Sequence, residues 1–201
     1  GCTVSNHFQC GFADSQVYNV TCQYFQEWAD GGVTLAHVTV ATWENAREAL
    51  DTIARWHRVF RDHSDIVVPA ESAADVRCAK QAGKTAVVLG FQNTSPFETD
   101  LGLVEVFHRL GIRFAQCTYN VQNHLGGSCY DPVDSGLTRF GKFVLGEMNR
   151  VGMVMDVSHV GERTALDCIE HSSKPVVATH ANPYFYLEHQ RNKSEQVLRK
   201  L

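Results

Sequence analysis

The sequence lacks three features that would each identify a class of protein. No apolar run approaches the ~20 residues that a membrane-spanning helix requires, so no membrane segment is predicted. Lysine and arginine form no dense stripe and the net charge is -4, which argues against a nucleic-acid partner or an anionic membrane surface. No GxGxxG or P-loop motif follows the first long apolar run, which disfavours a nucleotide site. A small, weakly charged or zwitterionic ligand is the remaining expectation.

The cysteines also lack a pattern. Seven are present without a CxxC pair, and an odd, unpatterned set is typical of reduced thiols rather than of a disulfide framework. The first ten residues, GCTVSNHFQC, contain no basic start followed by an apolar core, so they do not resemble a secretion signal. We therefore expect a cytoplasmic protein.

What the sequence does contain is an alternation of two kinds of segment. Its 201 residues are 44% hydrophobic and 20% charged, which is ordinary for one globular domain. Trp43 to Phe60 and Leu101 to Leu110 place apolar residues on one helical face, and apolar runs rich in β-branched residues lie between such segments. This order predicts an α/β fold built from βαβ units. The predicted strands are a weak first one around Val4 to Cys10, then 33–40, 85–92, 112–119, 152–159 and 174–181.

Polar residues at the ends of these strands favour a TIM (β/α)8 barrel over an open doubly wound sheet. Gln92, Tyr119, His159 and His180 each stand at the carboxyl end of a different predicted strand, which is the rim where barrel enzymes build their sites. A complete barrel needs eight strands and typically ~250 residues. We therefore expect one barrel domain over residues 1–201, truncated after about six strands and lacking the last ones.

Two of these strand ends carry histidine in similar settings, DVSHV for His159 and VATHANP for His180. Imidazoles at adjacent strand ends can converge on one divalent ion. A single histidine would more often be a hydrogen-bonded core residue, whereas two on successive strands favour contact with a metal or a substrate. Asp156 lies three residues before His159 and is expected to face the other way, as a structural hydrogen-bonding group.

Four longer motifs resemble the membrane (renal) dipeptidase family of zinc metallopeptidases. The resemblance is strongest from Thr85 to Arg199. It implies a TIM barrel with two zinc ions at the strand ends, cleavage of a dipeptide amide bond by metal-activated hydroxide, and a homodimer. The motifs are GFQNTSPFETDLGLVEVFHRLGIRFAQCTYN, GLTRFGKFVLGEMNRVGMVMDVSHVGERTALDCIE, KPVVATHANP and QRNKSEQVLR.

Carried over position by position, the family's two histidine ligands after the fifth and sixth predicted strands match His159 and His180. Its arginine that binds the substrate carboxylate matches Arg191, and a guanidinium fork suits a carboxylate better than an ammonium group does. The alternative for Arg191 is an exposed surface side chain. No residue of this chain is assigned as the catalytic acid or base, because the family's aspartate for that role falls beyond residue 201.

Other positions depart from the family pattern. Phe8 and Cys10 occupy the places of its first His-x-Asp pair, with His7 one position off. Gln92 replaces the glutamate that bridges two metals, and a neutral amide does not supply the anionic bridge. Tyr119 replaces a substrate-binding histidine and is the corresponding substrate-contact candidate. The resemblance implies one or two zinc ions, while the residues present favour one or none.

Three functions follow from these observations. The first is a hydrolase of dipeptides or similar small amides that carry a carboxylate, with a metal held at least by His159 and His180. The second is a non-catalytic relative that binds such a ligand through Arg191. The third is a one-metal amidohydrolase with an altered substrate. His124 and Asp131, in the long loop 119–136, are further candidates for the pocket wall.

Overall fold

The computed structural model describes the backbone of residues 3–7 and 17–201, with side chains from residue 23 onward. The chain divides into two compact units, Gly1–Val40 with Leu50–Gly90, and Ala41–Ala49 with Phe91–Leu201. We describe each unit by itself. The structure confirms the predicted α/β class, because parallel strands alternate with helices.

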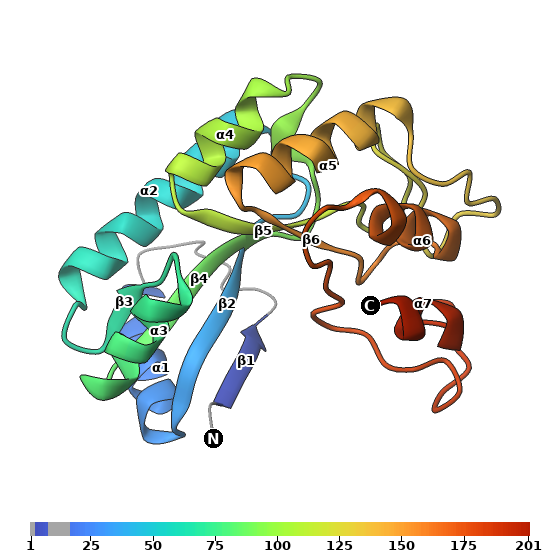
Figure 1. Cartoon of the computed structure of the whole chain (residues 1–201). Coiled ribbons are helices and arrows are strands. Elements are labelled where there is room, and N and C mark those ends of the chain that lie inside the picture. Colours follow the sequence, from blue (N-terminus) through green and yellow to red (C-terminus); the bar gives the residue numbers. More distant parts are fainter. Residues whose placement is uncertain (1–2, 8–16) are drawn as a thin grey trace. The chain divides into compact units, whose positions relative to one another are not determined.

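Strands β1, β2, β4 and β3 of the first unit are neighbours in a parallel sheet, and the first three lie side by side in Figure 1. Side chains of β2 alternate between buried and half-buried, as expected for a strand with one face toward a core. The strands and helices that begin in this part of the sequence are β1 (Thr3–His7), α1 (Val17–Asp30), β2 (Val33–Ala41), α2 (Ala46–Asp62), β3 (Val67–Pro69), α3 (Ala73–Gln81) and β4 (Thr85–Phe91).

An aromatic core joins the helices of this unit. Phe25 of α1 is fully buried, with its ring centroid 5.4 Å from that of Trp28 and 6.1 Å from that of Trp56 on α2. Helix α3 begins at a capping box, in which the Ser72 side chain accepts from the Asp75 backbone and the Asp75 side chain accepts from Ser72. Aromatic burial thus packs α1 against α2, and local capping fixes the start of α3.

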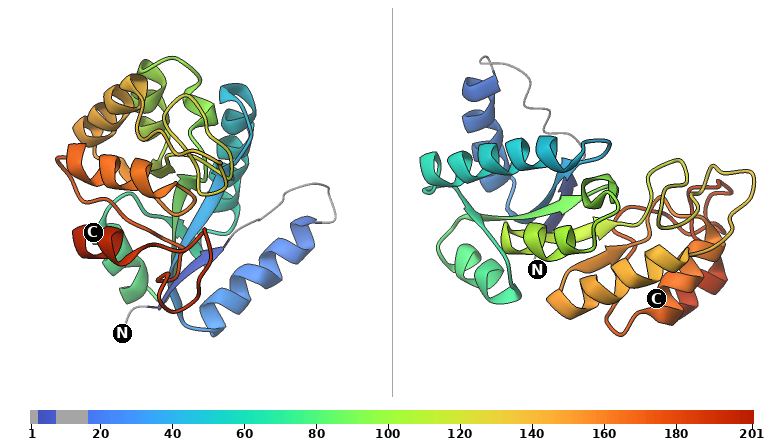
Figure 2. Two further views of the ribbon diagram at one scale, coloured as in Figure 1. Left: turned by 90° about the vertical axis from the view of Figure 1, so that its right-hand side faces the viewer. Right: turned by 90° about the horizontal axis from the view of Figure 1, so that it is seen from above.

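The second unit contains strands β5 and β6, which pair in parallel. Helices α4 and α5 pack side by side, as do α5 and α6, and both contacts can be followed in Figure 2. Helix α5 ends at Gly152, whose φ of 89° is a left-handed conformation that favours glycine. The elements are η1 (Ser95–Phe97), α4 (Gly102–Arg109), β5 (Ile112–Gln116), α5 (Arg139–Val151), β6 (Val154–Asp156), α6 (Glu162–His171) and α7 (Glu195–Lys200).

Two strands differ from the sequence prediction, and the first predicted strand is described only in part. The short strand β3 was not predicted, because three residues are too few to show a pattern. The predicted strand 174–181 forms only a parallel bridge between Val177 and Asp156. Of the predicted first strand, the structure describes a strand at Thr3–His7, and residues 8–10 lie outside the described residues.

Strand β6 also ends earlier than predicted, at Asp156 rather than at His159. The Asp156 carboxylate accepts hydrogen bonds from the backbone N–H of Ser158 (2.8 Å) and from its hydroxyl (2.6 Å). An aspartate bonded to the backbone two residues on turns the chain and ends the ladder. His159 therefore lies in a turn, and strand alternation does not set its direction.

Candidate metal and substrate site

Four of the predicted site residues form one cluster in the second unit. Tyr119 follows β5, His159 follows β6, His180 follows the bridge at Val177, and Arg191 lies before α7. The ring centroids of His159 and His180 are 4.9 Å apart, and that of Tyr119 is 4.3 Å from His159. The carboxyl ends of successive parallel segments thus bring together residues that are 72 positions apart at the extremes.

Gln92, the fifth predicted residue, is buried directly after β4. Its carbonyl accepts from the Gln116 side chain at 2.6 Å, and its N–H donates to the Ala41 carbonyl at 2.8 Å. These bonds attach the residue to the end of β5 and to the residue that ends β2. They fix its backbone and assign no role to its side chain.

His159 is held at both ring nitrogens. Nδ1 lies 2.7 Å from Oδ1 of Asn120, and Nε2 lies 3.0 Å from Nη2 of Arg191. A guanidinium only donates and an amide oxygen only accepts, so Nε2 carries the lone pair and Nδ1 carries the proton. Burial, together with the charges of Arg191, His180 and Lys193, lowers the pKa of His159 from its ordinary 6.5 to about 3. The imidazole is therefore neutral at physiological pH.

His180 is held by a different kind of group. Its Nδ1 lies 2.7 Å from the hydroxyl oxygen of Thr179, and this hydroxyl donates to Oδ2 of Asp156. A threonine hydroxyl has one proton, which here goes to the carboxylate, so its oxygen accepts from Nδ1–H of His180. Nε2 is then the nitrogen with the lone pair, as in His159.

The Asp156 carboxylate is only 2% exposed, and its oxygens are used by these bonds. In addition to the two bonds from Ser158, it accepts from the hydroxyl of Thr179 and from its backbone N–H, the latter at 3.3 Å. Asp156 is thus the hydrogen-bonding group expected from the sequence. It ties the end of β6 to the segment that carries His180.

Arg191 donates to three acceptors in the cluster. Nη1 donates to the Ser158 carbonyl, and Nη2 donates to Nε2 of His159 and, at 3.2 Å, to the His180 carbonyl. A second cation lies nearby, because Lys193 is 3% exposed and donates to the Val160 carbonyl at 2.8 Å. Burial lowers the pKa of Lys193 to about 8, with Arg191 adding to the effect. These cations make the surroundings of His159 suited to an anion such as a substrate carboxylate.

Tyr119 covers one side of the cluster. Its ring is tilted by 30° to that of His159, and its other contact is an edge-on one with Trp43, at 5.4 Å between centroids. Trp43 is 58% exposed, so this aromatic wall continues to the surface of the unit. An aromatic wall of this kind can shield a bound ligand from water.

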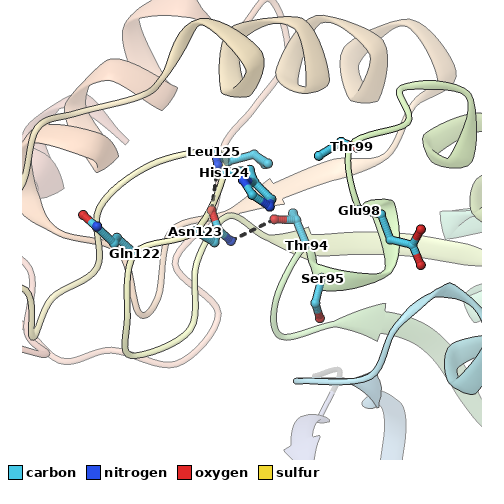
Figure 3. Close-up of a pocket in the computed structure, with 8 residues that line it drawn as sticks. All are labelled: Thr94, Ser95, Glu98, Thr99, Gln122, Asn123, His124 and Leu125. Atoms are coloured by element: carbon cyan, nitrogen blue, oxygen red, sulfur yellow. Dashed lines mark hydrogen bonds between the residues drawn. The ribbon is translucent and has the colours of Figure 1, made fainter.

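A separate cavity of about 610 Å³ lies between η1 and the long loop 119–136. Figure 3 shows Asn123 beside it, donating to the Thr94 hydroxyl at 3.0 Å and accepting from the Leu125 N–H at 2.7 Å. His124 lines this cavity, whereas Asp131 accepts from backbone N–H groups of the same loop. The lining residues are Thr94, Ser95, Glu98, Thr99, Gln122, Asn123, His124 and Leu125, so the histidine cluster does not border it.

Sequence reasoning did not single out the residues that orient the two histidines. Asn120 has a φ of 62°, a left-handed conformation that asparagine tolerates better than most residues. Its position directly after Tyr119, at a predicted strand end, was a usable signal. Thr179 gave no signal, because its role depends on Asp156, which is 23 positions away.

A catalytic zinc ion usually has three protein ligands. Among the side chains that the structure describes, from residue 23 onward, no three of His, Cys, Asp or Glu lie together as a metal-binding group. Two imidazoles with lone pairs on Nε2 fit two positions of a site for one zinc ion. Gln92 is a neutral amide and the oxygens of Asp156 already accept hydrogen bonds, so neither adds a free anionic donor to this pair.

Parallel βα units that bring two histidines together from neighbouring strand ends are typical of the barrel hydrolases. A solved structure of an amidohydrolase from Pseudomonas aeruginosa matches 99% of this chain at a TM-score of 0.90 and 38% identity. The family model for membrane dipeptidase (peptidase family M19) matches residues 11–201. The chain belongs to this family, which confirms the resemblance and the predicted barrel class.

One further relative supports the family assignment, and a second one supports the fold. Dipeptidase tcpJ of Claviceps purpurea is 31% identical over 157 residues, which cover 77% of this chain and 37% of the relative. A metallopeptidase from Rhodobacter sphaeroides, solved with a phosphinate mimic of L-Ala-D-Ala, is 17% identical with a TM-score of 0.81, and this likeness shows the fold alone. The chain spans 58% of the Pseudomonas structure and less than half of the curated relative.

Proposed function

We propose that the protein is a dipeptidase-type hydrolase that cleaves the amide bond of a dipeptide or of a similar small amide with a free carboxylate. The observation that carries this proposal is the pair His159 and His180. Their rings lie 4.9 Å apart, and the hydrogen bonds at Nδ1 leave the lone pair of each on Nε2. The likeness to dipeptidase tcpJ supports the same reaction class.

His159 and His180 are the residues that would hold a zinc ion. When bound, such an ion polarises the amide carbonyl and lowers the pKa of water, which supplies the nucleophile. Gln92 stands where the resemblance implies a bridging glutamate, so we propose one ion and not two. The additional ligands that a catalytic zinc needs are not found among the described residues.

Arg191 is the proposed contact for the substrate carboxylate. Three of its five N–H groups are used by Ser158, His159 and His180, which leaves the Nε–H and one N–H of Nη1 to donate to an incoming carboxylate. Those three bonds fix the guanidinium, so little side-chain entropy is lost on binding. Tyr119 is the proposed second substrate contact, because its ring packs on His159.

A non-catalytic binding protein is the second candidate, and one contact favours it. Nη2 of Arg191 donates to Nε2 of His159, the lone pair that a metal would need. A carboxylate receptor made of Arg191 and Lys193 would function in that arrangement without a metal. A one-metal amidohydrolase with an altered substrate is the third candidate, and Gln92 is compatible with it.

The deciding experiment measures metal content and turnover of the full-length protein. Plasma mass spectrometry should give about one zinc per chain, and a panel of dipeptides should be hydrolysed only without chelator. The matched control is His57→Ala, which removes an exposed histidine of α2 and should change neither result. Turnover that survives both chelation and His159→Ala would contradict the metal proposal. Binding of dipeptides without zinc and without turnover would establish the second candidate.

For the compartment, the oligomeric state and the domain organisation, our proposal keeps the expectations from the sequence. We propose a cytoplasmic homodimer with a small-molecule substrate, in which residues 1–201 belong to one barrel domain. Cys78, Cys117, Cys129 and Cys168 are free thiols, in keeping with a reducing compartment. No helix in the part of the chain that the structure describes is long and apolar enough to cross a bilayer.

A further inference from the structure

We propose that Asp156 is a positioning residue for His180 and that it acts through the hydroxyl of Thr179. The three groups form a hydrogen-bonded series, from Nδ1–H of His180 to Oγ1 of Thr179 and from that hydroxyl to Oδ2 of Asp156. The consequence for catalysis rests on the proposed function, in which Nε2 of His180 holds the metal. The series itself can be tested without activity.

The direction of each proton in this series is fixed by the acceptors around it. The Ser158 hydroxyl donates to Oδ1 of Asp156 at 2.6 Å, and its oxygen accepts the backbone N–H of His180 at 3.1 Å. The only proton of the Thr179 hydroxyl goes to Oδ2. An ionised carboxylate has no proton to give back, so Nδ1 of His180 has to be the donor.

The His180 ring and the Asp156 carboxylate are not hydrogen-bonded to each other directly. Nδ1 of His180 is 3.9 Å from Oδ2 of Asp156, which exceeds hydrogen-bond length. The hydroxyl of Thr179 bridges that distance with one bond on each side. Groups of this kind behind a metal-binding histidine fix its tautomer and ring orientation.

The first test reads the tautomer of His180 in the metal-free, full-length protein. Nitrogen-15 NMR of labelled histidine distinguishes a protonated ring nitrogen from one with a lone pair. We expect Nδ1–H in the wild type and in Thr179→Ser, which keeps the hydroxyl. Thr179→Val, which removes it at nearly constant volume, should shift the signal toward Nε2–H or to a mixture.

The matched control is Thr85→Val. Thr85 is fully buried, and its hydroxyl donates to the Val33 carbonyl at 2.9 Å within the first unit. The variant should lower stability without changing the His180 signal. The positioning role is wrong if the wild type shows Nε2–H, or if Thr179→Val keeps the wild-type spectrum.

Asp156→Asn tests the carboxylate at the other end of the series. An amide can donate to the Thr179 hydroxyl, which is then able to donate to Nδ1 of His180 and to favour the Nε2–H form. We expect the spectrum to change in the same direction as in Thr179→Val. An unchanged spectrum in Asp156→Asn would mean that the carboxylate does not set the tautomer.

The second test measures zinc affinity by calorimetry. Loss of a group behind a metal ligand typically weakens metal binding about 10- to 100-fold, and we expect this range for Thr179→Val with recovery in Thr179→Ser. If the spectra change as expected while the wild type binds no zinc, the proposed metal function is wrong and the positioning of His180 stands. Equal zinc affinity in the wild type and Thr179→Val would overturn the positioning role in metal binding.

Discussion

His159, in the turn after β6, and His180, after the bridge at Val177, lie in the same cluster, but their surroundings differ. A neutral amide, Asn120, accepts from Nδ1 of His159, whereas a carboxylate accepts from His180 through Thr179. Nε2 of His159 also faces the guanidinium of Arg191. Two similar sequence motifs thus produce one histidine beside cations and one histidine connected to an anion.

This difference indicates separate roles for the two sides of the cluster. The cations Arg191 and Lys193 lower the pKa of His159 and suit a substrate carboxylate. Asp156 lies on the other side, where hydrogen bonds from Ser158 and Thr179 stabilise its charge. We therefore expect changes near His159 to affect substrate binding more than changes near His180 do.

The largest expected effect comes from removing either histidine. His159→Ala and His180→Ala should each lower kcat/KM for a dipeptide by more than about 100-fold, because a metal ligand contributes more than the groups behind it. His159→Ala should also raise KM, since it releases one of the bonds that fix Arg191. Steady-state kinetics separate the two variants, and equal KM values would remove the proposed asymmetry.

Acid should destabilise the metal-free protein through His159. The folded pKa is about 3 and the ordinary value is 6.5, so between these values the unfolded chain binds a proton that the folded chain does not. The free energy of unfolding should therefore decrease as the pH is lowered. Relative to neutral pH, His159 should lower it by about 2 kcal/mol at pH 5. Denaturant unfolding of the wild type and His159→Gln measures the difference. Parallel pH profiles of the two proteins would contradict it.

Arg191→Lys should raise KM about tenfold and leave kcat little changed. Lysine keeps the charge but loses the planar guanidinium, whose several N–H groups donate to Ser158, His159 and His180 while others remain for a carboxylate. Arg163→Lys is the matched control, because Arg163 is an exposed arginine of α6 whose ion pair with Asp167 lies outside the cluster. A fall in kcat with constant KM would place Arg191 in the chemical step instead.

The smallest expected effect comes from a substitution that gives His159 an anionic partner, as His180 has through Thr179. In Asn120→Asp an anionic oxygen would accept from Nδ1 of His159, and the added charge should raise its pKa by about one unit or more. Asn120→Gly keeps a backbone suited to a φ of 62° and removes the acceptor, so it controls for loss of the side chain. Histidine NMR titration measures both variants, and equal pKa values would show that the acceptor's charge has no effect.

The sequence by itself determined the alternating α/β pattern, the barrel family and the positions of His159, His180 and Arg191. These depend on local periodicity and on motifs that are continuous along the chain. The strand ends were less well predicted, because the turn after Asp156 results from its side chain bonding to Ser158 rather than from apolar periodicity.

Only the tertiary structure decided how the site is oriented. Asn120 meets His159 across 39 positions, and Asp156 meets Thr179 across 23. The donor and acceptor pattern that assigns each proton exists only when these segments are side by side. A sequence can identify the histidines of such a site, but the lone pair on each ring depends on hydrogen bonds that the fold creates.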